Sequence, residues 1–170
     1  ATNRFEATRD KVQKYLNAKH REEIIFTKSA TESINLVASS FGKKHIHKGD
    51  EILITELEHH SNYVPWHYLR SEKGAIIKFA PVNEDGDVEI DSIKKLITNK
   101  TKIIAITHIS NVTGAILPIT KIVDLAKEKN IPVLIDGTQG APHCDIDMQK
   151  IDCDFYAISC HKMYGPNGLG

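Results

Sequence analysis

The chain has 170 residues, and its 22 basic side chains balance 22 acidic ones, so the formal net charge is zero. Hydrophobic residues make up 41% and charged residues 26%, a composition typical of a folded globular domain. The lack of a basic excess disfavours nucleic-acid binding, and no apolar run reaches the roughly 18 residues of a membrane helix. We therefore expect a protein that binds neither nucleic acid nor a membrane.

Cysteine usage points to a reducing compartment. Cys144, Cys153 and Cys160 form no CxxC pair, and an odd, sparse set does not make a disulfide framework. We expect a cytoplasmic protein, with an organelle left open because the first residue is Ala rather than Met. That start, and a turn at the last residues, suggest that the sequence is a piece of a longer protein.

Short apolar runs alternate with longer amphipathic stretches along the chain. Helical spacing of apolar residues and β-branched runs are the signals used to separate the two kinds of element. They predict helices at 4–16, 29–41, 61–71, 91–97 and 119–129, and strands at 23–27, 51–55, 75–79, 88–90, 102–107, 132–135 and 154–159. Strands that alternate with helices predict an α/β fold, a mostly parallel sheet with helices on both faces.

Polar side chains follow five of the predicted strands. In an open parallel sheet, ligands bind outside the carboxyl ends of the strands, which meet at one edge. We therefore expect a functional site formed by these five segments: 28–32, 58–60, 108–111, 136–139 and 160–162.

Three of these segments suggest specific chemistry. Ser29 and Glu32 fit a capping box, and a helix start with hydroxyls nearby suits a phosphate, although plain capping needs no ligand. Asp136 ends a buried apolar run and needs a partner there: a metal, a basic side chain or a protonated ring nitrogen. Lys162 is either a solvated loop lysine or a Schiff-base nucleophile, since a lysine beside another cation is activated for that role.

The nine histidines leave a second kind of site open. Imidazole is the commonest metal ligand, which makes a metal-dependent hydrolase an alternative. None of the spacings matches a known metal motif such as H-E-x-x-H, so no metal ligand is assigned. The candidates for that reading are His59, His60, His108, His143 and His161.

Several stretches together match a known family. The chain resembles the class V aminotransferase superfamily of pyridoxal 5′-phosphate (PLP) enzymes, and within it the group II, Suf-type cysteine desulfurases and selenocysteine lyase-like proteins. The matching stretches are FTKSATESINLVA at 26–38, EHHSNYVPW at 58–66, ITHISNVTG at 106–114, LIDGTQGAPH at 134–143 and DCDFYAISCHKMYGPNGLG at 152–170. The resemblance implies a fold type I, three-layer PLP domain, with residues 1–170 as its central part and the family's N-terminal segment and small C-terminal domain outside this chain.

The resemblance implies roles around the cofactor ring. Lys162 would bind PLP covalently, and Asp136 would pair with the ring nitrogen. His59 would stack on the ring and assist proton transfer, and Gln139 would hydrogen-bond the phenolic oxygen. Asn111 would lie near that oxygen or near the substrate carboxylate.

The resemblance also implies a phosphate end. Thr31, Ser159 and His161 would hold the phosphate, and Ala30 stands there where the family usually has Thr. Cys160 replaces the usual Gly beside His161. These two departures are the support for a further alternative, a non-catalytic relative that acts as a binding partner.

The implied reaction converts L-cysteine to L-alanine and passes sulfur, as a persulfide, to an acceptor protein for iron–sulfur cluster assembly. The family's persulfide cysteine lies downstream and matches none of the three cysteines, so we expect this chain alone to be inactive. The implied parent is a homodimer. A selenocysteine lyase or another class V lyase or epimerase is the alternative inside the superfamily.

Overall fold

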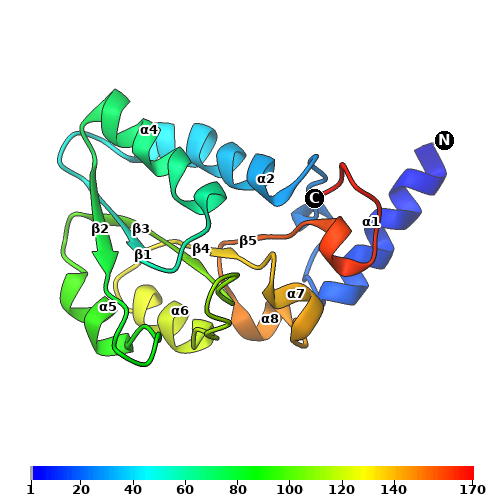
Figure 1. The fold of residues 1–170 in the computed structure, drawn as a ribbon. Helices are drawn as coiled ribbons and strands as arrows, with labels where there is room; N and C mark the ends of the chain where they lie inside the picture. The colour runs from blue at the N-terminus through cyan, green and yellow to red at the C-terminus, as the bar shows by residue number, and fades with distance from the viewer. Residues whose placement is uncertain (1) are drawn as a thin grey trace.

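The computed structural model describes residues 2–170. They form a five-stranded, all-parallel sheet in the order β2-β1-β3-β4-β5, and helices cover both faces (Figure 1). The three-layer α/β architecture expected from the sequence is therefore confirmed. The strands are β1 (Glu51–Thr55), β2 (Ile76–Ala80), β3 (Thr101–Thr107), β4 (Val133–Asp136) and β5 (Phe155–Ala157).

One face of the sheet is covered by α2 and α4. Helix α2 (Ala30–Val37) continues through a π-helical turn (Ala38–Gly42) into α3 (Lys43–His45), and α4 (Val64–Lys73) has Pro65 in its first turn, where a proline is tolerated. Trp66 and Ile34 are fully buried in the cluster between these helices and the sheet. Trp66 is thus a core residue.

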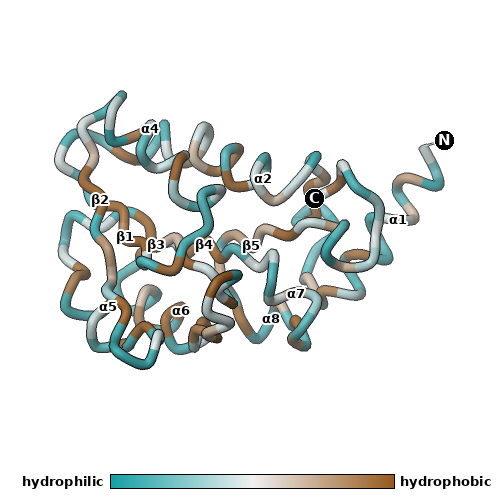
Figure 2. Tube along the Cα trace, in the orientation of Figure 1, coloured by the Kyte–Doolittle hydropathy of each residue, from teal (hydrophilic) through white to brown (hydrophobic). Residues whose placement is uncertain are grey.

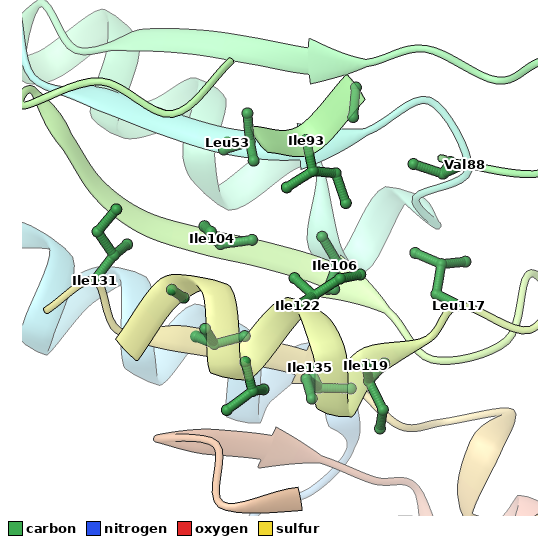
Figure 3. Close-up of a cluster of buried hydrophobic side chains, with 14 of the residues drawn as sticks. Leu53, Val88, Ile93, Ile104, Ile106, Leu117, Ile119, Ile122, Ile131 and Ile135 are labelled. Carbon is green, nitrogen blue, oxygen red and sulfur yellow. The ribbon is translucent and has the colours of Figure 1, made fainter. Parts of the chain in front are cut away.

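The other face is covered by α5 (Ile90–Leu96), α6 (Ile119–Lys127) and α8 (Met148–Ile151). Ile93 and Ile122 point from α5 and α6 toward Leu53, Ile104 and Ile106 on the sheet (Figure 3). Because β1, β3 and β4 are buried along almost their whole length, their central residues are apolar, as in other central parallel strands. Hydrophobic segments accordingly lie inside the layers and hydrophilic ones outside (Figure 2).

The remaining elements lie beside β5 or in the loops. Helix α1 (Thr2–Leu16) buries Leu16 against Ile24, and α7 (Gly140–His143) follows β4. Short 3-10 helices are η1 (Arg21–Glu23), η3 (His60–Asn62) and η4 (Cys160–Met163). None of the helices in residues 2–170 is long and apolar enough to cross a membrane.

The predicted strand at 23–27 is wrong. Glu23 belongs to η1 and Ile24 is extended, but the segment joins no sheet. Thr27 exchanges two backbone hydrogen bonds with Gly170 (2.8 and 2.9 Å), while an apolar cavity of about 880 Å³ lies between the segment, α1 and β5. A β-branched run becomes a strand only where a neighbouring strand completes its ladder, and here none among the described residues does.

The predicted strand at 88–90 is also wrong. Val88 is buried in the core, but α5 already begins at Ile90, and Glu89 is the residue before it. The helix predicted at 91–97 accordingly begins one residue earlier, and Ser92 lies inside it and donates to the carbonyl of Glu89 (2.6 Å).

The order of the strands creates a switch point between β1 and β3. The chain leaves β1 toward α4 on one face, and it leaves β3 toward α6 on the other (Figure 1). Loops that part in this way open a crevice at the carboxyl ends of the strands, where open α/β sheets bind ligands.

Candidate active site

Asp136 is a buried carboxylate at the end of β4, only 3% exposed. Its Oδ1 accepts a hydrogen bond from the Thr138 backbone N–H (3.0 Å), and its Oδ2 lies 3.5 Å from the Ser61 hydroxyl that donates to it. None of the ion pairs in residues 2–170 includes Asp136. A buried carboxylate without a basic partner suits a cationic ring nitrogen.

The Ser61 hydroxyl lies between His59 and this carboxylate. His59 precedes η3, and its Nδ1 accepts from the Ser61 backbone N–H (3.1 Å) and lies 2.8 Å from the Ser61 Oγ. Ser61 therefore connects His59 to Asp136. The His59 side chain is otherwise exposed, so its ring is free to contact a ligand in the crevice.

The start of α2 and the end of β5 meet at a second point. The Ala30 backbone N–H donates to the buried Ser159 Oγ (2.9 Å), and the Ser29 Oγ caps the helix by accepting from the Glu32 N–H (3.2 Å). The Ser159 hydroxyl accepts here, so its proton remains for a third group. Thr31 is exposed on the same turn, and together these groups suit an anion.

The predicted capping box is changed in one detail. The Glu32 carboxylate accepts from the backbone N–H of Lys28 instead of that of Ser29.

Lys162 and His161 lie on η4, directly after β5. Lys162 is half-buried and His161 exposed, and Lys162 takes part in no ion pair among residues 2–170. Helix α7 packs against η4, which brings the lysine's turn next to the segment that follows Asp136.

Asn111 and Gln139 line one cavity. It has a volume of about 420 Å³, and the loop after β3 and His143 complete its wall. Between Asp136 and Gln139, the hydroxyl of Thr138 is buried and has no hydrogen-bond partner. A buried hydroxyl without a partner, beside a carboxylate that no basic side chain neutralises, suits a polar ligand, since an unsatisfied buried polar group costs free energy.

A metal centre receives no support from this arrangement. Within residues 2–170, no three His, Cys, Asp or Glu side chains are grouped so that they could hold an ion. His108, one of the candidates, is buried and bonded to the Tyr156 hydroxyl (2.8 Å), and burial lowers its pKa.

Known proteins match this chain over its whole length. The family model described as Aminotransferase class-V matches residues 1–170. This chain belongs to the class V aminotransferase family. The family resemblance read from the sequence is thus confirmed.

Relatives of this class V chain are named as desulfurases. It is 46% identical over 170 residues to a "Probable cysteine desulfurase" of Halalkalibacterium halodurans and 50% identical to one of Staphylococcus epidermidis. The crystal structure of the cysteine desulfurase CsdA from Escherichia coli superposes with a TM-score of 0.95 at 40% identity, over 99% of this chain. The chain spans 41–42% of the length of these proteins.

Four residues of this class V chain shape the site but have no role in the expectations drawn from the sequence. Glu58 stood in the expected strand-end segment without a function, and Ser61, Thr138 and Tyr156 were not singled out. Ser61 and Thr138 could have been found, because each stands two positions from an expected ligand-binding residue. Tyr156 could not, because its partner His108 comes from a distant strand.

Proposed function

We propose that the whole protein is a PLP-dependent cysteine desulfurase that converts L-cysteine to L-alanine. The observation that carries this proposal is the buried, unpaired Asp136 at the strand ends of a class V domain. Relatives over the full length of this chain are named cysteine desulfurases, which favours this reaction over the selenocysteine lyase alternative.

The residues present fit PLP at both ends. Asp136 would hold the ring nitrogen protonated, His59 would lie on the ring, and Gln139 and Asn111 would contact its oxygen side. Ser159, Thr31, His161 and the first turn of α2 at Ala30 would hold the phosphate. Lys162 would attach the cofactor covalently. When bound, PLP supplies an electron sink that weakens the bonds of the substrate's α-carbon.

The chain's own groups would then position the substrate and move its protons. The Nζ of Lys162 would move the proton of the substrate's α-carbon. His59 would assist proton transfer. A cysteine thiolate would attack the substrate's sulfur atom, so that the S–S bond of a persulfide forms as the carbon–sulfur bond breaks. The bonding pair would stay with the β-carbon, which would take a proton, and the carbon part would leave as alanine.

The persulfide would form on a cysteine outside this chain. Burial raises the pKa of Cys153 to about 12 and raises that of Cys160, which is opposite to what a nucleophilic thiolate needs. We further propose that residues 1–170 are the central part of the large domain of a homodimer that passes sulfur to an acceptor protein for iron–sulfur cluster assembly. The three free cysteines favour a reducing compartment such as the cytoplasm.

Covalent trapping tests the proposal. Protein mixed with PLP and reduced with borohydride should carry the cofactor on the peptide that contains Lys162, as read by mass spectrometry. Lys162→Ala should lose this label, and Lys150→Ala, at an exposed lysine of α8, should keep it. A trapped label in Lys162→Ala would refute the assignment. For the whole protein, alanine formed from L-cysteine is the assay for the reaction.

A further inference from the structure

Glu58 is an acidic side chain at the switch point to which no role has been given. It stands three residues after the end of β1, in the loop that leads to η3. Part of the residue remains exposed, but its carboxylate lies deep among protein atoms. An acid in that position needs hydrogen-bond donors, because an unpaired buried charge is costly.

Donors from three elements meet this carboxylate. The Thr55 hydroxyl of β1 (2.6 Å) and the Thr107 backbone N–H of β3 (3.0 Å) donate to its Oε1. The Asn62 side-chain amide of η3 donates to its Oε2 (2.6 Å). Asn62 is itself fixed, because its oxygen accepts from the indole N–H of the buried Trp66 (3.1 Å). Glu58 therefore ties the β1 loop to the end of β3 and to the core.

The short segment held by these bonds carries two groups of the candidate site. His59 follows Glu58 directly, and Ser61 precedes Asn62. The Ser61 backbone N–H donates to His59, and the Ser61 hydroxyl donates to Asp136. The segment 59–61 is thus held at both ends, because Glu58 before it and Asn62 after it are hydrogen-bonded to each other.

We propose that Glu58 is a positioning residue, whose ionised carboxylate holds the 58–62 loop so that His59 and Ser61 face Asp136 in the cofactor site. This inference rests on the proposed PLP function. Glu58 acts through His59 and Ser61 and touches no reacting atom.

The positioning depends on the charge of Glu58. The carboxylate accepts all three hydrogen bonds. A protonated acid or an amide at this position carries a donor of its own, which would face the Asn62 amide or the Thr107 N–H, and two donors cannot bond each other. Burial raises the pKa of Glu58 to about 7, hydrogen bonds from Thr55, Asn62 and Thr107 oppose this, and Asp136 of β4 adds to it. Asp136 is the charged group that faces Glu58, while its contacts from β1, β3 and η3 are neutral. The loop is accordingly held best above neutral pH.

The test compares Glu58→Gln with the matched variant Glu56→Gln, which removes one charge from an exposed residue of the same loop. The first measurement needs no cofactor: the NMR signal of the Trp66 indole N–H and the amide exchange of Ser61 and Asn62. The second is the dissociation constant of PLP at about pH 6 and about pH 8. Thr55→Val, which removes one donor and keeps the shape, replaces Glu58→Gln if the latter does not fold.

We expect Glu58→Gln to shift the Trp66 signal and to speed exchange at Ser61 and Asn62. It should weaken PLP binding about tenfold or more near pH 8, the effect of losing one hydrogen bond to a charged group. The ratio of the PLP dissociation constants of Glu58→Gln and wild type should fall to about twofold near pH 6, where wild-type Glu58 is itself protonated. Glu56→Gln should follow the wild type in both measurements.

Four results would overturn the inference. An unchanged Trp66 signal and loop exchange in Glu58→Gln would show that Glu58 does not hold the loop. A changed loop with PLP affinity equal to that of Glu56→Gln, or a gap that does not depend on pH, would show a structural role only. A wild-type protein that binds no PLP would overturn the proposed function and this inference together, and it is recognised because every variant then fails alike.

Discussion

Replacement of Glu58 by Gln should change how the stability of the protein depends on pH. Burial raises the pKa of Glu58 from 4.5 to about 7, against hydrogen bonds from Thr55, Asn62 and Thr107. Between these values the folded protein holds a proton that the unfolded chain has released. The contribution of Glu58 is therefore fully present below pH 4.5 and is lost as the pH rises through about 7.

The size of this effect follows from the shift. A change of that extent corresponds to about 3 kcal/mol, and because Glu58 keeps part of its surface exposed we expect about 1–3 kcal/mol. Relative to wild type, Glu58→Gln should gain this much free energy of unfolding between about pH 5 and about pH 8. The ionised form that holds the loop is thus the less stable one.

Urea unfolding followed by the fluorescence of Trp66 measures this difference, since Trp66 is the only tryptophan and is fully buried. Wild type, Glu58→Gln and Glu56→Gln are compared at each pH. The free energy of unfolding of Glu56→Gln should change with pH as that of wild type does. If the curve of Glu58→Gln is also parallel to that of wild type, or if the difference has the opposite sign, the pKa of the Glu58 carboxylate is not raised in the folded protein.

Three further outcomes are expected. Gly137→Ala should lower the free energy of unfolding by about 1–3 kcal/mol, because the new Cβ would lie 2.0 Å from the Tyr156 ring. This loss, measured by urea unfolding, should be smaller when Tyr156 is replaced by Leu. If the effects of the two substitutions are additive, the ring is not the obstacle. Ser159→Ala should lose about 1 kcal/mol of stability and bind PLP more weakly. Ser39→Ala, on an exposed helix turn, should show neither effect. If the two variants behave alike, Ser159 does not contribute to phosphate binding. Cys153 should resist iodoacetamide in the folded chain at about pH 8, because burial raises its pKa to about 12, and its labelling before unfolding, read by mass spectrometry, would contradict this.

The strands and long helices could be predicted because each carries its own signal. Residues 52–55 are apolar or β-branched, and the predicted bounds, 51–55, are those of β1. The spacing of apolar residues likewise located α1, α2 and α6 to within a few residues. Helices α7 and α8 have only four residues each, too few to show a period, and they were missed.

The site could be predicted only as far as strand ends show it. Asp136 and Lys162 follow strands, and the structure places both at the expected edge. The loop anchored by Glu58 could not be foreseen, because its donors include Thr107, 49 residues away. The error at 23–27 has a similar cause: local preference makes this segment extended, but the presence of a neighbouring strand is a property of the whole sheet.

The hydrogen bond between Ala30 and Ser159 has a consequence for the order of folding. It joins residues 129 positions apart, and the link from Ser61 to Asp136 spans 75. Contacts between such distant residues form slowly, because a long loop must close before they contribute. The contact between the first turn of α2 and Ser159 therefore cannot form before β5 has docked, and a ligand that bound both would favour chains whose last strand is in place. Such a ligand would stabilise the folded protein and disfavour the detachment of β5 from the sheet.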